Sequence, residues 1–494
     1  MTHPGVHEPA ARWFPINPFG GESKLDLFRQ RLAEGRGIKR SESSRIMLKA
    51  GTRRRSFMTD PAGYRGKALA FLRKAGAGVG NVLAVETKWG SVSGTLVPRY
   101  TSADETHIVL KLKSGYNVGL DVSGLVSGKV VAKGEPPSFK APPLPGRTPG
   151  LPKVLLLGTG GTIASRIDYR TGAVHPAVDA SNLHALVPEL SEAAAVDSEI
   201  VFNVFSENMS PAHWSKLAKR VAKAPKEGYQ GVVVTHGTDT LGYTAAALSF
   251  ALAGIGIPVI LTAAQRSSDR PSSDATLNLI GAVSVAAKAP FAGVYLAAHL
   301  DENDGKIAIH AGTRVRKDHT SRRDAFRTVG GDPVAVWSRD GFEHIADGLS
   351  RRSDDKFVPR PGFSDGAALL KFHPSMSPKL LAFLKRSGKK AVVVEGTGLG
   401  HVGSEVVAAL KRFTTGGGLA FMTSQCINGR VDLDVYDTGR DLKVAGVVPL
   451  EDMLSETALT KASWALANAR GPTGAKDLML KNVAGEMDAR RFPG

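Results

Sequence analysis

Short, almost entirely apolar runs recur along the middle of the chain, and each of them ends at glycine or at polar residues. Four of these runs are "KVLLLG" at 153–158, "GVVVTHG" at 231–237, "PVILTAA" at 258–264 and "AGVYLAAH" at 292–299. Strands that are covered by helices on both faces of a parallel sheet have this composition. Helical stretches at 211–224 and 240–253 separate the runs. The alternation predicts an α/β domain over residues 153–364.

The same alternation restarts after residue 365 over a shorter length of chain. Its strand-like runs are "GAALLKFH" at 366–373, "KKAVVVEGTGLG" at 389–400 and "GGLAFMTSQC" at 417–426. A second, smaller α/β layer is therefore expected over residues 365–470. The remaining residues, 471–494, have a mixed pattern, and we expect them to form a peripheral C-terminal segment.

The chain before the first α/β domain has a different period. Residues 63–75 predict a short helix, after which apolar and polar residues alternate in short stretches separated by glycine. This is the pattern of β-strands. We expect a small all-β, barrel-like module over residues 61–132, too small to hold a catalytic pocket of its own. The proline-rich residues 133–152 predict a stiff linker and a domain boundary.

Positive charge is concentrated at the start of the chain. The formal net charge is +18, a balance that favours polyanionic partners such as nucleic acid. Residues 1–57 hold 12 Lys/Arg against 5 Asp/Glu. We expect residues 1–60 to be a basic, solvated and disordered extension.

The composition also bears on the compartment. Cys426 is the single cysteine, which excludes a disulfide framework and a cysteine-based zinc site and fits a reducing cytoplasm. Residues 247–264 are uncharged, but Gly254, Gly256 and Pro258 divide them into a helix end, a turn and a strand. We therefore expect no membrane segment and a cytoplasmic protein. Four histidines show no metal-ligand spacing and are expected to be structural or solvated: His236, His299, His310 and His319.

The turn in "LLLGTGGTIAS", 155–165, is the first candidate for chemistry. It fails the dinucleotide-binding pattern because Ile163 stands where the third glycine belongs, and it lacks the lysine of a phosphate-binding P-loop. Two interpretations stay open. The turn is a strand-to-helix connection with a capping threonine, or its glycines expose the Thr162 hydroxyl as a nucleophile.

Further polar clusters follow other strands. "THGTDT" at 235–240 places Thr238 and Asp239 after a buried strand, where a side chain caps the next helix or faces a crevice. In the charged segment 310–326 we expect a solvated loop, with Lys317 as the exception that acts as a base beside Thr238. Because parallel strands carry their sites at the carboxyl ends, these clusters are expected to meet at one edge of the sheet.

"TGGTIAS" at 159–165 and "THGTDT" at 235–240 resemble the two threonine motifs of the L-asparaginase/glutaminase family. The resemblance covers about residues 153–470 and implies a two-domain fold whose active sites form at a homodimer interface. It implies that Thr162 is a nucleophile with Tyr169 as its partner. The other roles that it implies are a second catalytic triad of Thr238, Asp239 and Lys317, and substrate binding by Ser206, Glu207 and Gly161, the first two through the α-carboxylate and α-amino groups.

Other segments narrow the resemblance. The β module, "HTSRRDAFR" at 319–327 and "GRVDLDVYDTGRDL" at 429–442 are similar to the asparaginase-like D subunits of archaeal glutamyl-tRNA(Gln) amidotransferases. That family implies glutamine as substrate, no cofactor in this subunit, and ammonia that passes to a partner E subunit. The partner then uses ATP and Mg²⁺ to amidate Glu-tRNA(Gln), and tRNA(Gln) is bound through the complex. The similarity begins near Met58, which makes Met58 a possible start.

Two other functions remain open on the sequence. A free-standing asparaginase is one, although it would need neither the β module nor the linker. A non-catalytic nucleic-acid-binding scaffold is the other, because of the net charge of +18. The sequence also leaves open which of the two threonines forms an acyl-enzyme.

Overall fold

The computed structural model describes most of the chain from residue 63 onward. The described residues are 63–88, 90–99, 104–112, 117–133, 150–161, 165–167, 174–176, 187, 189–266 and 273–488. The basic extension, most of the proline-rich linker, Thr162 and Tyr169 lie outside these residues.

The N-terminal module is a β-sheet with one helix packed on it. Within the described residues, five antiparallel strands are paired in the order β4-β3-β2-β1-β5. Helix α2 contributes Ala68 and Leu72 to a core that also holds Leu83, Val85 and Ile108. The predicted helix and strands are thereby confirmed. Their bounds are α2 Gly66–Lys74, β1 Val82–Thr87, β2 Gly90–Leu96, β3 His107–Lys111, β4 Asn117–Asp121 and β5 Leu125–Ala132.

The larger α/β domain is built on a mixed sheet. Among the described residues, eight strands lie in the order β17-β16-β13-β12-β11-β10-β6-β9. The predicted parallel part runs from β9 to β12, and β13, β16 and β17 add an antiparallel edge. The bounds are β6 Lys153–Gly158, β9 Ala195–Ile200, β10 Gly231–Thr235, β11 Pro258–Thr262, β12 Gly293–His299, β13 Lys306–Ala311, β16 Ala335–Ser338 and β17 Gly341–Ile345. Two further strands pair with each other, β7 Ser165–Ile167 and β8 Val174–Pro176.

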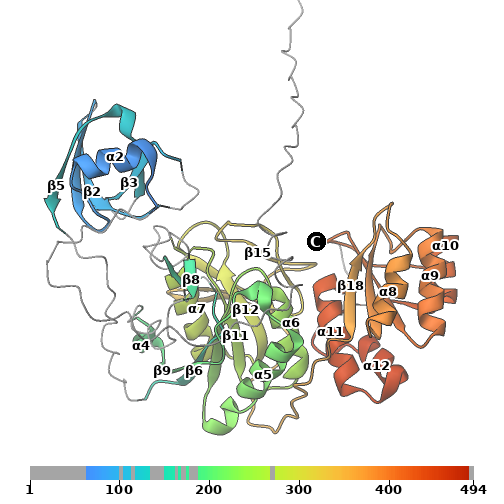
Figure 1. The fold of residues 1–494 in the computed structure, drawn as a ribbon. Coiled ribbons are helices and arrows are strands. Elements are labelled where there is room, and N and C mark those ends of the chain that lie inside the picture. Colours follow the sequence, from blue (N-terminus) through green and yellow to red (C-terminus); the bar gives the residue numbers. More distant parts are fainter. Residues whose placement is uncertain are drawn as a thin grey trace, which may run out of the picture. The chain divides into compact units, whose positions relative to one another are not determined.

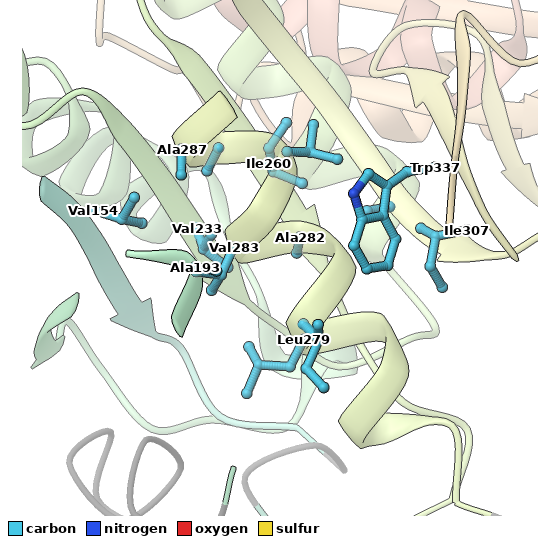
Figure 2. Packing of buried hydrophobic residues seen from close by; sticks show 14 of the residues in the cluster. Val154, Ala193, Val233, Ile260, Leu279, Ala282, Val283, Ala287, Ile307 and Trp337 are labelled. Carbon is cyan, nitrogen blue, oxygen red and sulfur yellow. The ribbon is translucent and has the colours of Figure 1, made fainter. Parts of the chain in front are cut away.

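Alternating strand residues supply two separate cores, one on each face of this sheet. In β6, Val154 and Leu156 join the core that contains α7, whereas Leu155 and Leu157 join the core formed with α5 and α6. Figure 2 shows the α7 side, where Val283 and its neighbours pack on the strands. A strand buried on both faces has to be apolar throughout, which is why these runs are readable in the sequence. The helices are α4 Leu190–Ala193, α5 Pro211–Val221, α6 Leu241–Ala251 and α7 Ala275–Lys288.

The C-terminal domain repeats the architecture on a smaller scale. In the described part of the chain, its parallel strands lie in the order β18-β19-β20-β21. Figure 1 shows α8 and α11 on opposite sides of β18. One core joins this sheet to α8, α9 and α10, and another joins it to α11 and to α12, which spans Gly471–Leu480. The predicted second α/β layer is confirmed. The bounds are β18 Ala367–Lys371, β19 Ala391–Gly396, β20 Leu419–Ser424, β21 Val447–Pro449, α8 Lys379–Arg386, α9 Ser404–Thr415, α10 Asp437–Val444 and α11 Ser455–Asn468.

The residues after 470 are more integral to the fold than we expected. Helix α12, Gly471–Leu480, buries Ala475 and Met479 in the core with α11, and Met487 joins them. Widely spaced apolar residues among charges and glycines carry this packing, so the mixed sequence pattern concealed it. The expectation of a peripheral segment is wrong for residues 471–488.

The uncharged stretch 247–264 is divided as predicted between the end of α6 and strand β11. None of the helices in the described residues is long and apolar enough to cross a membrane.

Candidate active site

Two glycine turns lie side by side at the carboxyl ends of β6 and β10. The parallel register sets Gly158 opposite Thr235. Just beyond, the backbone N–H and the hydroxyl of Thr159 both donate to the Thr235 carbonyl, at 3.1 and 2.9 Å. The two threonine motifs of the sequence therefore leave the sheet at adjacent points, as the strand pattern predicted.

Glycine is required where these turns touch. Gly161 has a φ of +86°, and a Cβ there would lie 2.3 Å from the Gly237 nitrogen. A Cβ on Gly237 would in turn come 2.7 Å from the Cβ of Ser206. Such separations are too short for any side chain. Three segments, at 158–161, 204–208 and 235–240, are thus packed backbone against backbone around one point.

Lys317 joins this point from a separate hairpin. Its Nζ donates to the Thr238 hydroxyl at 2.9 Å and forms an ion pair with Asp239 at 2.6 Å. The hairpin consists of β14, Val315–Lys317, and β15, Phe326–Thr328. Thr238 is only 7% exposed, whereas the Asp239 side chain is 67% exposed. The structure thus brings together all three residues of the expected second triad.

The side chains after β10 do not cap the next helix. Thr240, and neither Thr238 nor Asp239, occupies the N-terminal cap position of α6, and its side chain makes no capping hydrogen bond. Its hydroxyl instead donates to the Ser206 carbonyl at 2.6 Å. The capping role that the sequence allowed for Thr238 and Asp239 is therefore wrong. The sequence did not predict the hydrogen bond from Thr240 to Ser206, because a threonine before a helix has the pattern of an ordinary cap.

Two of the three expected substrate-binding residues, Ser206 and Glu207, begin a short 3-10 helix, Ser206–Asn208. Ser206 is buried against Gly237, and Glu207 next to it is exposed. The close approach of Ser206 to the 237 turn was visible in the sequence only as the glycine of that turn. Thr162 and Tyr169 lie outside the described residues, so their places in the site stay predictions.

A buried hydrogen-bond chain lies behind the turn of Thr238. The Nδ1 of His236 is 2.8 Å from the Gly237 carbonyl, which can only accept, so Nδ1 carries the proton. Burial lowers the pKa of His236 to about 4, which leaves Nε2 free to accept from the Thr244 hydroxyl at 3.0 Å. Trp214 donates to the same hydroxyl at 3.1 Å. His236 is thus a neutral structural histidine that holds the peptide next to Thr238.

The charged segment 310–326 differs from the solvated loop that we expected. It contains the end of β13 and the strand β14, and Arg314 and Asp324 within it are buried. Burial alone would raise the pKa of Asp324, but the guanidinium groups of Arg322 and Arg327 hold it below its usual value. The high charge density signalled a surface because the pairing that satisfies these charges is not readable from sequence.

In the site, one amine contacts both a hydroxyl and a carboxylate, and groups of these kinds activate a hydroxyl nucleophile. No group of three or more His, Cys, Asp or Glu side chains in the described residues is arranged to hold a metal ion.

Curated relatives decide the family. The chain is 44% identical over 433 residues to the D subunit of the glutamyl-tRNA(Gln) amidotransferase of Metallosphaera sedula, covering 87% of this chain and 97% of that protein. It is 45% identical over 425 residues to the protein of the same name from Pyrococcus furiosus, covering 84% and 96%. This chain belongs to the family of these D subunits.

Three family models match successive regions of this chain. Residues 77–131 match the GatD N-terminal domain, residues 153–347 match the N-terminal asparaginase domain, and residues 367–479 match the glutaminase/asparaginase C-terminal domain. The β module is thus part of the family's organisation, and Thr238, Asp239 and Lys317 lie within the matched asparaginase domain.

Solved structures give the same fold for the two α/β domains. The thermostable L-asparaginase from Thermococcus kodakarensis matches with a TM-score of 0.62 and 32% identity over 68% of this chain and 100% of that chain. L-Asparaginase I from Vibrio cholerae matches with a TM-score of 0.59 and 26% identity over 69% and 100%. This chain therefore has the two-domain asparaginase fold that the sequence predicted.

Proposed function

We propose that this chain hydrolyses glutamine and supplies the ammonia for converting Glu-tRNA(Gln) to Gln-tRNA(Gln). One observation carries the chemistry: the Lys317 amine contacts both the Thr238 hydroxyl and the Asp239 carboxylate at a strand end where two glycine turns meet. The membership of the D-subunit family directs this chemistry toward glutamine.

The reaction proceeds through a threonine ester. The hydroxyl oxygen of Thr162 or Thr238 attacks the side-chain amide carbon of glutamine. If Thr238 attacks, Asp239 first takes one proton from the Lys317 ammonium, and the neutral amine then accepts the hydroxyl proton of Thr238. If Thr162 attacks, its proton passes through the Tyr169 hydroxyl to the leaving nitrogen. Backbone N–H groups of the strand-end turns stabilise the oxyanion that forms. The carbon–nitrogen bond then breaks, a proton passes to the leaving nitrogen, and ammonia departs. Water attacks the acyl-enzyme and releases glutamate with the regenerated threonine. Tyr169 assists Thr162, while Ser206, Glu207 and Gly161 hold the substrate.

The ammonia has a consumer outside this chain. We assign it to a partner E subunit that activates the glutamyl group on tRNA(Gln) with ATP and Mg²⁺, so that this chain itself needs no cofactor. Two copies of this chain form a homodimer that completes the active site, and tRNA(Gln) binds through the whole complex. The single cysteine is compatible with the reducing cytoplasm, where we place the reaction.

The test measures ammonia release from glutamine by the chain alone, with the partner subunit, and with the partner plus Glu-tRNA(Gln). We expect strong stimulation in the full complex. Equal turnover in all three mixtures would contradict the link to tRNA.

The rival function is a free-standing asparaginase, which the fold shared with solved L-asparaginases favours. The same assay with asparagine separates the two. Rapid hydrolysis of asparagine by the isolated chain, without a response to the partner, would replace our proposal. If the chain hydrolyses neither glutamine nor asparagine but binds tRNA tightly and in a salt-dependent way, it is instead a non-catalytic scaffold.

A further inference from the structure

The strand that carries Lys317 has two faces with different partners. Val315 and Lys317 point toward the large domain, where Val315 is buried in the core with α5 and α6 and Lys317 reaches Thr238. The alternate residues, Arg314 and Arg316, pair with acids of the C-terminal domain and its final segment. Successive strand side chains point in opposite directions, so whatever holds the second face also fixes the first.

Arg314 makes the central contact on the second face. Its side chain is 8% exposed, and its guanidinium donates to Asp452 at 2.9 Å, to Asp488 at 3.0 Å and to the Gly485 carbonyl at 2.9 Å. A planar guanidinium meets several acceptors in one fixed geometry, which the single ammonium of lysine cannot reproduce. Arg314 therefore fixes both the position and the direction of the chain just before β14.

Neighbouring residues extend this attachment on both sides of Arg314. The Thr313 hydroxyl donates to the Ala484 carbonyl at 3.0 Å, and the Thr457 hydroxyl donates to the Thr313 carbonyl at 2.9 Å. Arg316 forms an ion pair with Glu456 at 3.2 Å. Residues 313–316 are thus attached to the start of α11 and to residues 484–488.

The segment that receives Arg314 is itself anchored. Lys461 of α11 and Glu486 form a fully buried ion pair at 2.5 Å. Glu486 also accepts from the backbone N–H groups of Val483 and Ala484. Any rearrangement of residues 483–486 that separates this pair would leave a buried charge without its partner, which is costly. The segment that receives Arg314 is therefore held in place by its own contacts.

We propose that Arg314 is a positioning residue for Lys317, and that the segment 482–488 after α12 sets where the Lys317 amine lies relative to Thr238. The inference rests on the proposed function, because it assumes that Lys317 acts in glutamine hydrolysis. Arg314 does not touch the reacting groups. It acts through two residues of strand, and a displacement of about 1 Å at a catalytic group is enough to reduce turnover strongly.

The test uses the full chain in its complex and compares Asp488→Asn with Asp477→Asn. Asp488 is half exposed and outside the core, so its neutral replacement should fold. Asp477 is an exposed aspartate on α12 and serves as the matched control. We expect Asp488→Asn to lower kcat for glutamine about tenfold while KM and the melting temperature stay at the control values.

Arg314→Lys is the second variant. It should lower kcat at least as much, because lysine keeps the charge but lacks the planar guanidinium that meets several acceptors at once. A merely structural clamp would lower the melting temperature and leave kcat per folded molecule unchanged. The inference is overturned if both variants turn over glutamine at the rate of Asp477→Asn. If the unmodified complex hydrolyses no glutamine, the proposed function fails first, and that outcome is distinct because it involves no substitution.

Discussion

Gly161 and Gly237 are in such close contact that a Cβ on Gly161 would lie 2.3 Å from the Gly237 nitrogen. The two residues come from motifs that are 76 positions apart in the chain. Their contact joins the turn that leads to Thr162 with the turn that carries Thr238. The geometry of the proposed site thus depends on the absence of side chains at this one place.

Replacement of Gly161 by alanine should therefore abolish activity. Alanine would be strained at a φ of +86° and would collide with backbone that cannot yield. We expect kcat to fall by about 100-fold or more, because the turns must separate. Gly228→Ala is the control, since Gly228 has a φ of +80° but open space around it. The control should cost about 1 kcal/mol of unfolding free energy and retain full activity. Equal activity of both variants would contradict this account.

The amine of Lys317 should be essential. Lys317→Met removes the hydrogen bond to Thr238 and the ion pair with Asp239, so we expect kcat/KM for glutamine to fall by about 100-fold or more. The pair is partly exposed, and the unfolding free energy should change by about 1 kcal/mol or less. Lys306→Met breaks the exposed pair with Glu343 and serves as the control with unchanged kinetics. A Lys317→Met variant with normal turnover would remove Lys317 from the mechanism.

Arg352 should contribute to stability and not to catalysis. Its guanidinium donates to four backbone carbonyls, those of Gln230, Ala286, Ala287 and Ala289, and so ties the end of α7 to the start of β10. A cation at a helix C-terminus and hydrogen bonds from a charged group both stabilise the folded state. Arg352→Met should therefore lower the free energy of unfolding by about 2–3 kcal/mol. Urea unfolding measures this cost. Arg351→Met, at an exposed neighbouring position, should cost far less. The start of β10 lies at the end of the strand opposite the site, so kcat of folded Arg352→Met should stay normal.

His310 should make the protein less stable as the pH falls. Burial, with the nearby Arg327, lowers the pKa of His310 to about 3, whereas an unfolded histidine titrates near 6.5. The unfolded chain therefore takes up a proton that the folded chain refuses, and stability is lost as the pH falls from about 6.5 toward 3. Between pH 7 and pH 5 this histidine accounts for about 2 kcal/mol.

The matched variant is His310→Asn, which keeps a partner for the Thr328 hydroxyl 2.8 Å from Nδ1 but cannot titrate. The free energy of unfolding in urea should fall between pH 7 and pH 5 in both proteins, and the fall should be smaller by about 2 kcal/mol in the variant. An equal difference in both proteins would show that His310 does not titrate in this way.

The sequence predicted the parts of the fold that bury apolar strands on both faces. β6, β10 and β11 could be predicted because each residue of their apolar centres, 154–157, 232–234 and 259–261, belongs to one of the two cores. β14 could not be predicted, since three residues are too few to show an alternating pattern. Arg314 just before it and Arg316 within it give this segment the charge of a solvated loop. Their acid partners lie more than 130 residues away, at Asp452 and Glu456. Local patterns carry no information about such pairing.

The sequence also predicted one part of the site and missed another. Thr238 and Asp239 follow a readable strand, and their chemistry is local to one motif. Their contact with Lys317 was expected and is found, whereas the packing of Gly161 on Gly237 and of Ser206 on the same turn was not expected. Close approach of two backbones leaves only glycine in the sequence, and glycine has many other causes.

In the proposed mechanism, a threonine of this chain carries the acyl group of glutamine during hydrolysis. The most direct measurement quenches the complex with acid during turnover of glutamine and locates the adduct by peptide mass spectrometry. We predict a glutamyl ester on Thr162 or on Thr238, absent when the same threonine is replaced by alanine. Steady release of ammonia with no adduct on either threonine would rule out a threonine ester as the intermediate.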